Sequence, residues 1–122
     1  MDDSASKLWK SMWDFITESG IERYHHDKLY NWLKSDFPQA EYEKTRGGIR
    51  VDIAIDKIAI EVKGPTENKD LESISKQALT RLNYYENVIF VLCEPKFTDK
   101  HFNEIEKAIK RELPKVGVIT FG

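Results

Sequence analysis

Residues 49–63, with the sequence IRVDIAIDKIAIEVK, decide the fold. Isoleucine or valine occupies every second position on either side of the dipeptide at 56–57. This alternation is typical of two amphipathic strands, and the short gap between them predicts a β-hairpin. With a two-residue loop, Ile53 faces Ile60; a loop with an odd number of residues would spoil the match of the two apolar faces.

The open end of the same hairpin predicts three further facing pairs: Val51 with Val62, Asp52 with Glu61, and Arg50 with Lys63. The two acids are the unusual pair, because directly opposed residues have Cβ atoms only about 5 Å apart and like charges there are destabilising. A divalent cation would offset the repulsion, since Mg²⁺ prefers hard oxygen ligands and commonly takes one or two carboxylates.

Lys63 follows Glu61 by two residues and therefore lies on the same face of its strand. An ammonium group in that place can hold a water molecule or stabilise negative charge that develops on a phosphate. Two acids and a lysine around a metal ion therefore predict the hydrolysis of a phosphodiester.

The elements around the hairpin follow from changes in hydrophobic period. Helices are expected over residues 6–18, 25–36, 68–85 and 98–113, and further strands over residues 41–45, 88–92 and 116–121. A hairpin followed by a β-α-β crossover predicts a mixed sheet flanked by helices. The length of 122 residues predicts one domain over residues 1–122.

The charge balance limits the expected partners. The chain has 19 Lys and Arg against 21 Asp and Glu, so tight nucleic-acid binding through bulk charge is not expected. A nucleic-acid partner would need local placement of Lys and Arg. We expect a cytoplasmic protein with no membrane partner. The chain has a single cysteine, Cys93, a polar start at Met1–Ser4 and no apolar run near 20 residues.

Asp52, followed by Glu61-Val62-Lys63, resembles the motif of the PD-(D/E)xK nucleases, also called the restriction-endonuclease-like superfamily. The core of that superfamily is α-β-β-β-α-β, which is the order predicted for residues 25–92. Small archaeal Holliday-junction-resolvase-like or stand-alone nucleases are the most similar members. The resemblance implies a restriction-endonuclease-like α/β fold, with an extra N-terminal helix and a C-terminal helix and strand.

The resemblance also implies roles for individual residues. Asp52 and Glu61 would bind Mg²⁺ or Mn²⁺, and the backbone carbonyl of Val62 would complete the ligand set. Lys63 would orient the attacking water, and Gln77 on the following helix would assist. Together these residues imply a metal-dependent deoxyribonuclease, acting as an endonuclease on DNA phosphodiesters and, as in many small relatives, as a homodimer.

Several assignments stay open at this stage. Members of the superfamily often carry an upstream glutamate, for which the candidates are Glu18, Glu22, Glu41 and Glu43. Arg46 and Arg50 flank two glycines and could contact a phosphate backbone, although Gly47 and Gly48 themselves are typical of a strand-joining turn. The chain departs from the superfamily pattern at Val51, where a proline is common.

Three alternatives remain beside the nuclease. The chain could be a catalytically inactive nuclease-fold module that binds nucleic acid or a protein, or an enzyme acting on RNA or free nucleotides. In the third, Asp52 and Glu61 are ordinary polar positions on a solvated sheet face, with Arg50 and Lys63 as ion-pair partners. Helices expected on both sides of the sheet argue against full solvation of that face.

Overall fold

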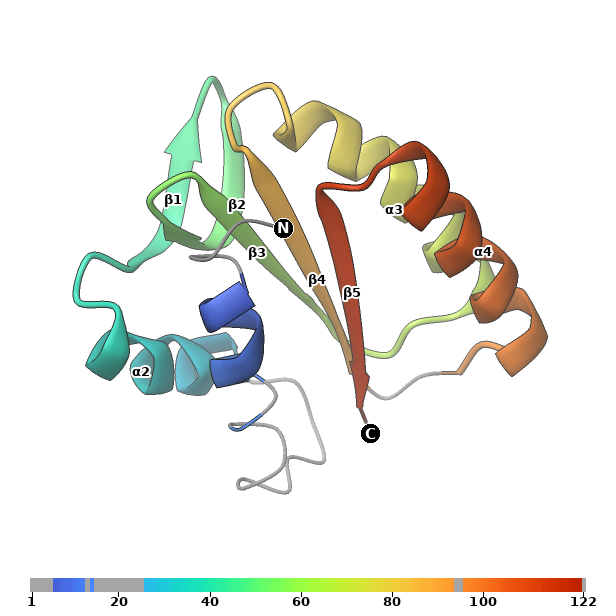
Figure 1. Ribbon diagram of the computed structural model, residues 1–122, viewed down its shortest axis with the longest axis horizontal. Helices are drawn as coiled ribbons and strands as arrows, with labels where there is room; N and C mark the ends of the chain where they lie inside the picture. Colours follow the sequence, from blue (N-terminus) through green and yellow to red (C-terminus); the bar gives the residue numbers. More distant parts are fainter. Residues whose placement is uncertain (1–5, 13, 15–25, 94–95, 122) are drawn as a thin grey trace.

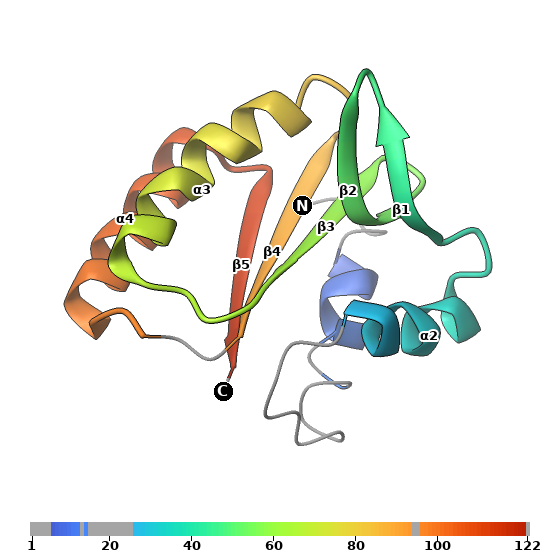
Figure 2. The ribbon, with the colours of Figure 1, turned by 180° about the vertical axis from the view of Figure 1, so that it is seen from behind.

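The computed structural model describes residues 6–12, 14, 26–93 and 96–121. Within this part the chain is an α/β protein in which helices cover both faces of a five-stranded mixed sheet (Figures 1 and 2). The elements are, in chain order, α2 (His26–Asp36), β1 (Glu41–Arg46), β2 (Ile49–Ile55), β3 (Ile58–Lys63), α3 (Asn68–Arg81), β4 (Asn87–Cys93), α4 (Asp99–Glu112) and β5 (Val116–Phe121).

The strands lie in sequence order, β1-β2-β3-β4-β5. The first three are antiparallel neighbours joined by short turns, whereas β4 and β5 pair in parallel. Parallel neighbours need a crossover, and α3 and α4 supply the two crossovers on the same side of the sheet (Figure 1). The mixed sheet flanked by helices is therefore confirmed.

The turn end of the central hairpin has the register that alternation predicted. The β2–β3 ladder pairs Ile53 with Ile60, Ala54 with Ala59 and Ile55 with Ile58. The loop is the dipeptide at 56–57, in which Asp56 takes a left-handed conformation with φ of 53°. The Gln39 side-chain amide donates a 3.0 Å hydrogen bond to the Asp56 carboxylate and holds this turn.

Two apolar layers sandwich the sheet. Side chains of residues 6–12 and α2 pack on one face, where the fully buried members include Leu8, Met12, Leu33, Ile53, Ile60 and Ile89. Side chains of α3 and α4 pack on the other, around Leu71, Ile74, Ala78, Phe90 and Leu92. Every residue of β4 is buried, as expected for a strand whose sequence is a nearly continuous apolar run.

The helix boundaries follow local chemistry. A reciprocal capping box between Glu67 and Asp70 begins α3, and the Thr98 hydroxyl accepts a 3.2 Å hydrogen bond from the His101 N–H at the start of α4. The predicted extent of the third helix, to residue 85, is wrong, because α3 ends at Arg81. Residues 82–84 form a turn instead.

Two further expectations concern the N-terminal helix and membrane-spanning helices. The N-terminal helix is present at residues 6–12 and at residue 14; its expected remainder, with residue 25 of the second helix, lies outside the described residues. None of the described helices has the length and apolarity that a bilayer span requires.

Candidate functional site

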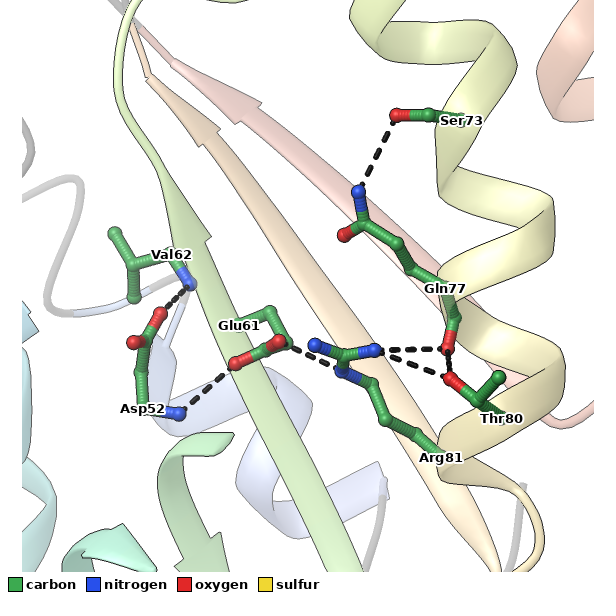
Figure 3. Close-up of polar contacts among 7 residues, drawn as sticks. All are labelled: Asp52, Glu61, Val62, Ser73, Gln77, Thr80 and Arg81. Atoms are coloured by element: carbon green, nitrogen blue, oxygen red, sulfur yellow. Dashed lines mark hydrogen bonds and ion pairs between the residues drawn. The ribbon is translucent and has the colours of Figure 1, made fainter. Parts of the chain in front are cut away.

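The site begins where the β2–β3 ladder stops. Beyond the pair Ile53–Ile60, side chains take over the role of backbone partners (Figure 3). The Asp52 N–H donates to Glu61 Oε1 at 2.9 Å, and the Val62 N–H donates to Asp52 Oδ2 at 2.8 Å. Each acid therefore binds the backbone of the opposite strand, and the two hydrogen bonds interlock β2 and β3.

This interlock corrects part of the predicted register. The expected pairs Val51–Val62 and Arg50–Lys63 are not part of the ladder, since regular pairing ends at Ile53. Carboxylate oxygens, and not backbone carbonyls, accept the two hydrogen bonds at this level. Asp52 and Glu61 are nevertheless in contact, through the Asp52 backbone N–H and the Glu61 carboxylate and not as a ladder pair.

The strand alternation also changes at this point. Val51 packs in the layer under α3, whereas Ile53 packs in the layer under α2, although residues two apart share a face in a regular strand. The predicted common face of these two residues is thus wrong. The neighbouring strand is irregular at the same level: the flanking β1–β2 pairs place Glu43 opposite Asp52, and Glu43 has a φ of 52°.

Glu61 has a cationic partner that the sequence analysis missed. The Arg81 Nε donates a 2.7 Å hydrogen bond to Glu61 Oε2, and Nη1 donates to the carbonyl oxygen of Gln77 at 3.1 Å (Figure 3). Because Glu61 is buried and pairs with α3, the alternative of a solvated sheet face is wrong for this residue. The positive charge expected from a metal ion is supplied here by a guanidinium.

A signal for Arg81 was present in the sequence. Residues four apart on a helix lie on the same face, and Arg81 follows Gln77 by four. Gln77 was expected to assist at the site of the two acids. Arg81 lies one helical turn later on the same face of α3, so the same reasoning would have placed it near them. Figure 3 shows both side chains extending from α3 toward β3.

A pocket of about 160 Å³ adjoins the end of β3; Asp52 and Glu61 are not among its lining residues. Its lining includes Lys63 from the strand and Ser73 and Gln77 from α3. The Gln77 amide nitrogen donates to the Ser73 hydroxyl at 3.3 Å, while its Oε1 is buried without a partner among the described residues. A buried acceptor without a donor marks a place where a water molecule or a ligand can bind.

The acids present suit a hard cation. An ionised carboxylate offers about four acceptor sites, so the hydrogen bonds to Asp52 and Glu61 leave positions for an ion. Mg²⁺ is commonly held by one or two carboxylates and keeps several waters. No group of three or more Asp, Glu, His or Cys side chains with metal-site geometry occurs among the described residues.

The upstream acids differ in their positions. Glu43 lies opposite Asp52 and 3.9 Å from the Arg50 guanidinium. Glu41 lies farther along β1, opposite Ala54, and its side chain is about half exposed. A hydrogen bond from Lys44 holds the pKa of its carboxyl below the ordinary value of 4.5. Glu43 is therefore the better placed of the two, while Glu18 and Glu22 lie outside the described residues.

The two candidate phosphate-binding arginines are held differently. Arg46 lies over the Tyr85 ring, 4.7 Å from its centroid, whereas the Arg50 side chain is two-thirds exposed. Gly47 and Gly48 between them have φ of 56° and 79°, so their assignment to a turn is confirmed. The Tyr84 ring covers Gly47 so closely that a Cβ would overlap it.

Comparisons with protein-family models, with curated proteins and with solved structures give no match to this chain. Its function is therefore inferred from its own residues.

Proposed function

We propose that this chain is a metal-dependent deoxyribonuclease with a restriction-endonuclease-like, PD-(D/E)xK core. The observation that carries the proposal is the interlock of Asp52 and Glu61 at the open end of the β2–β3 hairpin. The order of elements from α2 to β4 supports it, because α-β-β-β-α-β is the core order of that superfamily. Lys63 and Gln77 at the adjoining pocket complete the set.

The residues divide the chemistry among them. Asp52 and Glu61 would hold Mg²⁺ or Mn²⁺, with the Val62 carbonyl as a further ligand. When bound, such an ion lowers the pKa of water and neutralises charge on a phosphoryl oxygen. Lys63 would orient the attacking water or stabilise charge on the phosphate, and the unpartnered Gln77 oxygen would accept a hydrogen bond from that water.

DNA is the proposed substrate, cut endonucleolytically. Arg50 is the residue best placed to contact its backbone, since its guanidinium is exposed and its ion pair with Glu43 is long at 3.9 Å. A net charge of −2 predicts weak binding without metal, because the acids repel phosphate. A homodimer remains part of the proposal, to be measured by analytical ultracentrifugation.

The test is cleavage of labelled linear, branched and single-stranded DNA, with RNA in parallel, in Mg²⁺, Mn²⁺ or EDTA. Asp52→Asn is the decisive variant: it removes the charge but keeps an oxygen that can accept from the Val62 N–H. Asp56→Asn, in the turn at the other end of the hairpin, is its matched control. Metal-dependent cleavage lost only in Asp52→Asn is the expected result. Cleavage that survives Asp52→Asn would place the chemistry elsewhere.

A non-catalytic nucleic-acid- or protein-binding module is the second candidate, and the Arg81–Glu61 pair is the observation that favours it. A guanidinium already compensates the buried acid, so the fold does not require a metal ion. Calorimetry distinguishes the two candidates. A folded protein that takes up neither Mg²⁺ nor Mn²⁺ and cuts none of the substrates would be the module.

A further inference from the structure

Arg81 and Glu61 form a largely buried ion pair between α3 and β3. The guanidinium Nε lies 2.7 Å from the carboxylate, and the exposed fractions of the two side chains are 15% and 4%. A second Arg–Glu pair, Arg111 with Glu112 on α4, has the same 2.7 Å separation, but both of its side chains are about two-thirds exposed. The chain thus contains a buried pair and an exposed pair with the same atoms in contact.

Burial makes the positive charge of Arg81 necessary. A buried carboxylate without a partner is strongly destabilising, and the Glu61 side chain is only 4% exposed. In the protein without metal, the guanidinium is the described cation that contacts Glu61. The guanidinium therefore supplies the positive charge that was expected to come from a divalent ion.

A divalent ion and Arg81 would therefore use the same carboxylate. An ion between Asp52 and Glu61 would stand close to the guanidinium, and two positive charges at that range repel most strongly where water is excluded. We propose that Arg81 is a built-in counter-ion that competes with the metal for Glu61 and thereby weakens metal binding. This inference rests on the metal site of the proposed function.

The guanidinium has other partners when Glu61 turns toward an ion. Its Nη1 already donates to the Gln77 carbonyl at 3.1 Å and to the Thr80 hydroxyl at 3.3 Å, both on its own helix. Arg81 can stay on α3 without losing all its hydrogen bonds. Exchange between the guanidinium and the metal at Glu61 then requires only side-chain movement.

Calorimetric titration with Mn²⁺ tests the competition in the wild type, Arg81→Met, Arg81→Lys and the matched control Arg111→Met. Methionine removes the charge but keeps much of the apolar stem, whereas lysine keeps the charge. We expect Arg81→Met to bind Mn²⁺ about tenfold more tightly, within the usual range of coupling between two sites. Arg81→Lys and Arg111→Met should stay near the wild-type affinity.

Thermal unfolding gives a second measurement. Without metal, Arg81→Met should melt well below the wild type, and saturating Mn²⁺ should raise its melting temperature more than that of the wild type. If Arg81→Met does not fold alone, recovery of its circular dichroism spectrum on addition of Mn²⁺ supports the competition. Failure of Mn²⁺ to restore folding contradicts it.

The outcomes separate this inference from the proposed function. If the wild type binds Mn²⁺ and Arg81→Met binds it equally or more weakly, Arg81 only positions Glu61 and the competition is wrong, while the metal site stands. If the wild type and every variant fail to bind Mn²⁺, the metal site of the proposed function is wrong, and the competition is overturned with it.

Discussion

The two ends of the β2–β3 hairpin belong to the same strands but are held together by different hydrogen bonds. At the turn end, backbone pairs run from Ile55–Ile58 to Ile53–Ile60, and all of these side chains are buried. At the open end the ladder stops, and carboxylates from Asp52 and Glu61 bind the backbone of the opposite strand. The turn end is apolar and regular, while the open end is charged and irregular.

The comparison shows that one small hairpin can hold a regular apolar end and an irregular charged end. Apolar burial and a continuous ladder at one end hold the strands at a fixed register. That rigidity allows the other end to depart from regular pairing at Asp52 and Glu61. Under the proposed function, stability would depend mainly on the turn end and chemistry on the open end.

The lysines at the two ends of β3 give the sharpest test of this separation. Lys63→Met should reduce DNA cleavage by about 10³-fold, or about 4 kcal/mol in activation free energy, because a charge beside the phosphate is lost. Lys57→Met, in the exposed turn, should leave cleavage near the wild-type rate. Single-turnover kinetics with Mg²⁺ measure both. Equal losses in the two variants would contradict the division between the ends.

A cavity at the turn end should act on stability alone. Ile60 is completely buried, so Ile60→Ala should lower the free energy of unfolding by about 3 kcal/mol, within the range for large-to-small core changes. Urea denaturation measures this loss. The cleavage rate per folded molecule, measured well below the midpoint of unfolding, should stay unchanged. A large fall in that rate would show that the two ends are coupled.

Gly47 tests the turn that joins β1 to β2 near the open end. It combines a φ of 56° with close cover by the Tyr84 ring, so Gly47→Ala introduces both backbone strain and a clash. We expect a loss of about 2 kcal/mol in unfolding free energy. Gly48→Ala is the control for φ alone, since nothing lies within 4 Å of its Cβ position. Equal losses would mean that Tyr84 moves aside at no cost.

Tyr85 should give the smallest effect. Its hydroxyl is buried without a partner among the described residues, and burial raises the pKa of the phenol above 10.0. The folded chain therefore keeps the proton while the unfolded chain releases it, so this residue costs stability as the pH rises above about 10. Tyr85→Phe should remove that alkaline loss and change the unfolding free energy at pH 7 by no more than about 1 kcal/mol.

Urea titrations of the wild type and Tyr85→Phe at pH 7 and pH 10.5 measure the difference. A fall in DNA cleavage with Tyr85→Phe at neutral pH would contradict a purely structural role. It would extend the site from Glu61 toward Arg46, which stacks on the same ring.

Much of this architecture could be predicted because its causes are local. Alternation with a period of two gave the strands on either side of the turn at 56–57, and with it the pairing of Ile53 with Ile60. The continuous apolar run in β4 gave a strand buried on both faces. The end of α3 was harder to predict, because apolar spacing continues to Tyr85 although the helix ends at Arg81.

The sequence by itself determined the order of elements, the register at the turn end of the hairpin and the closeness of Asp52 to Glu61, since each depends on periods and spacings within a short stretch. Only the tertiary structure decided that Glu61 pairs with Arg81, 20 residues away, and that Val51 leaves the face of Ile53. Both features depend on contacts between the sheet and α3, which no local period records.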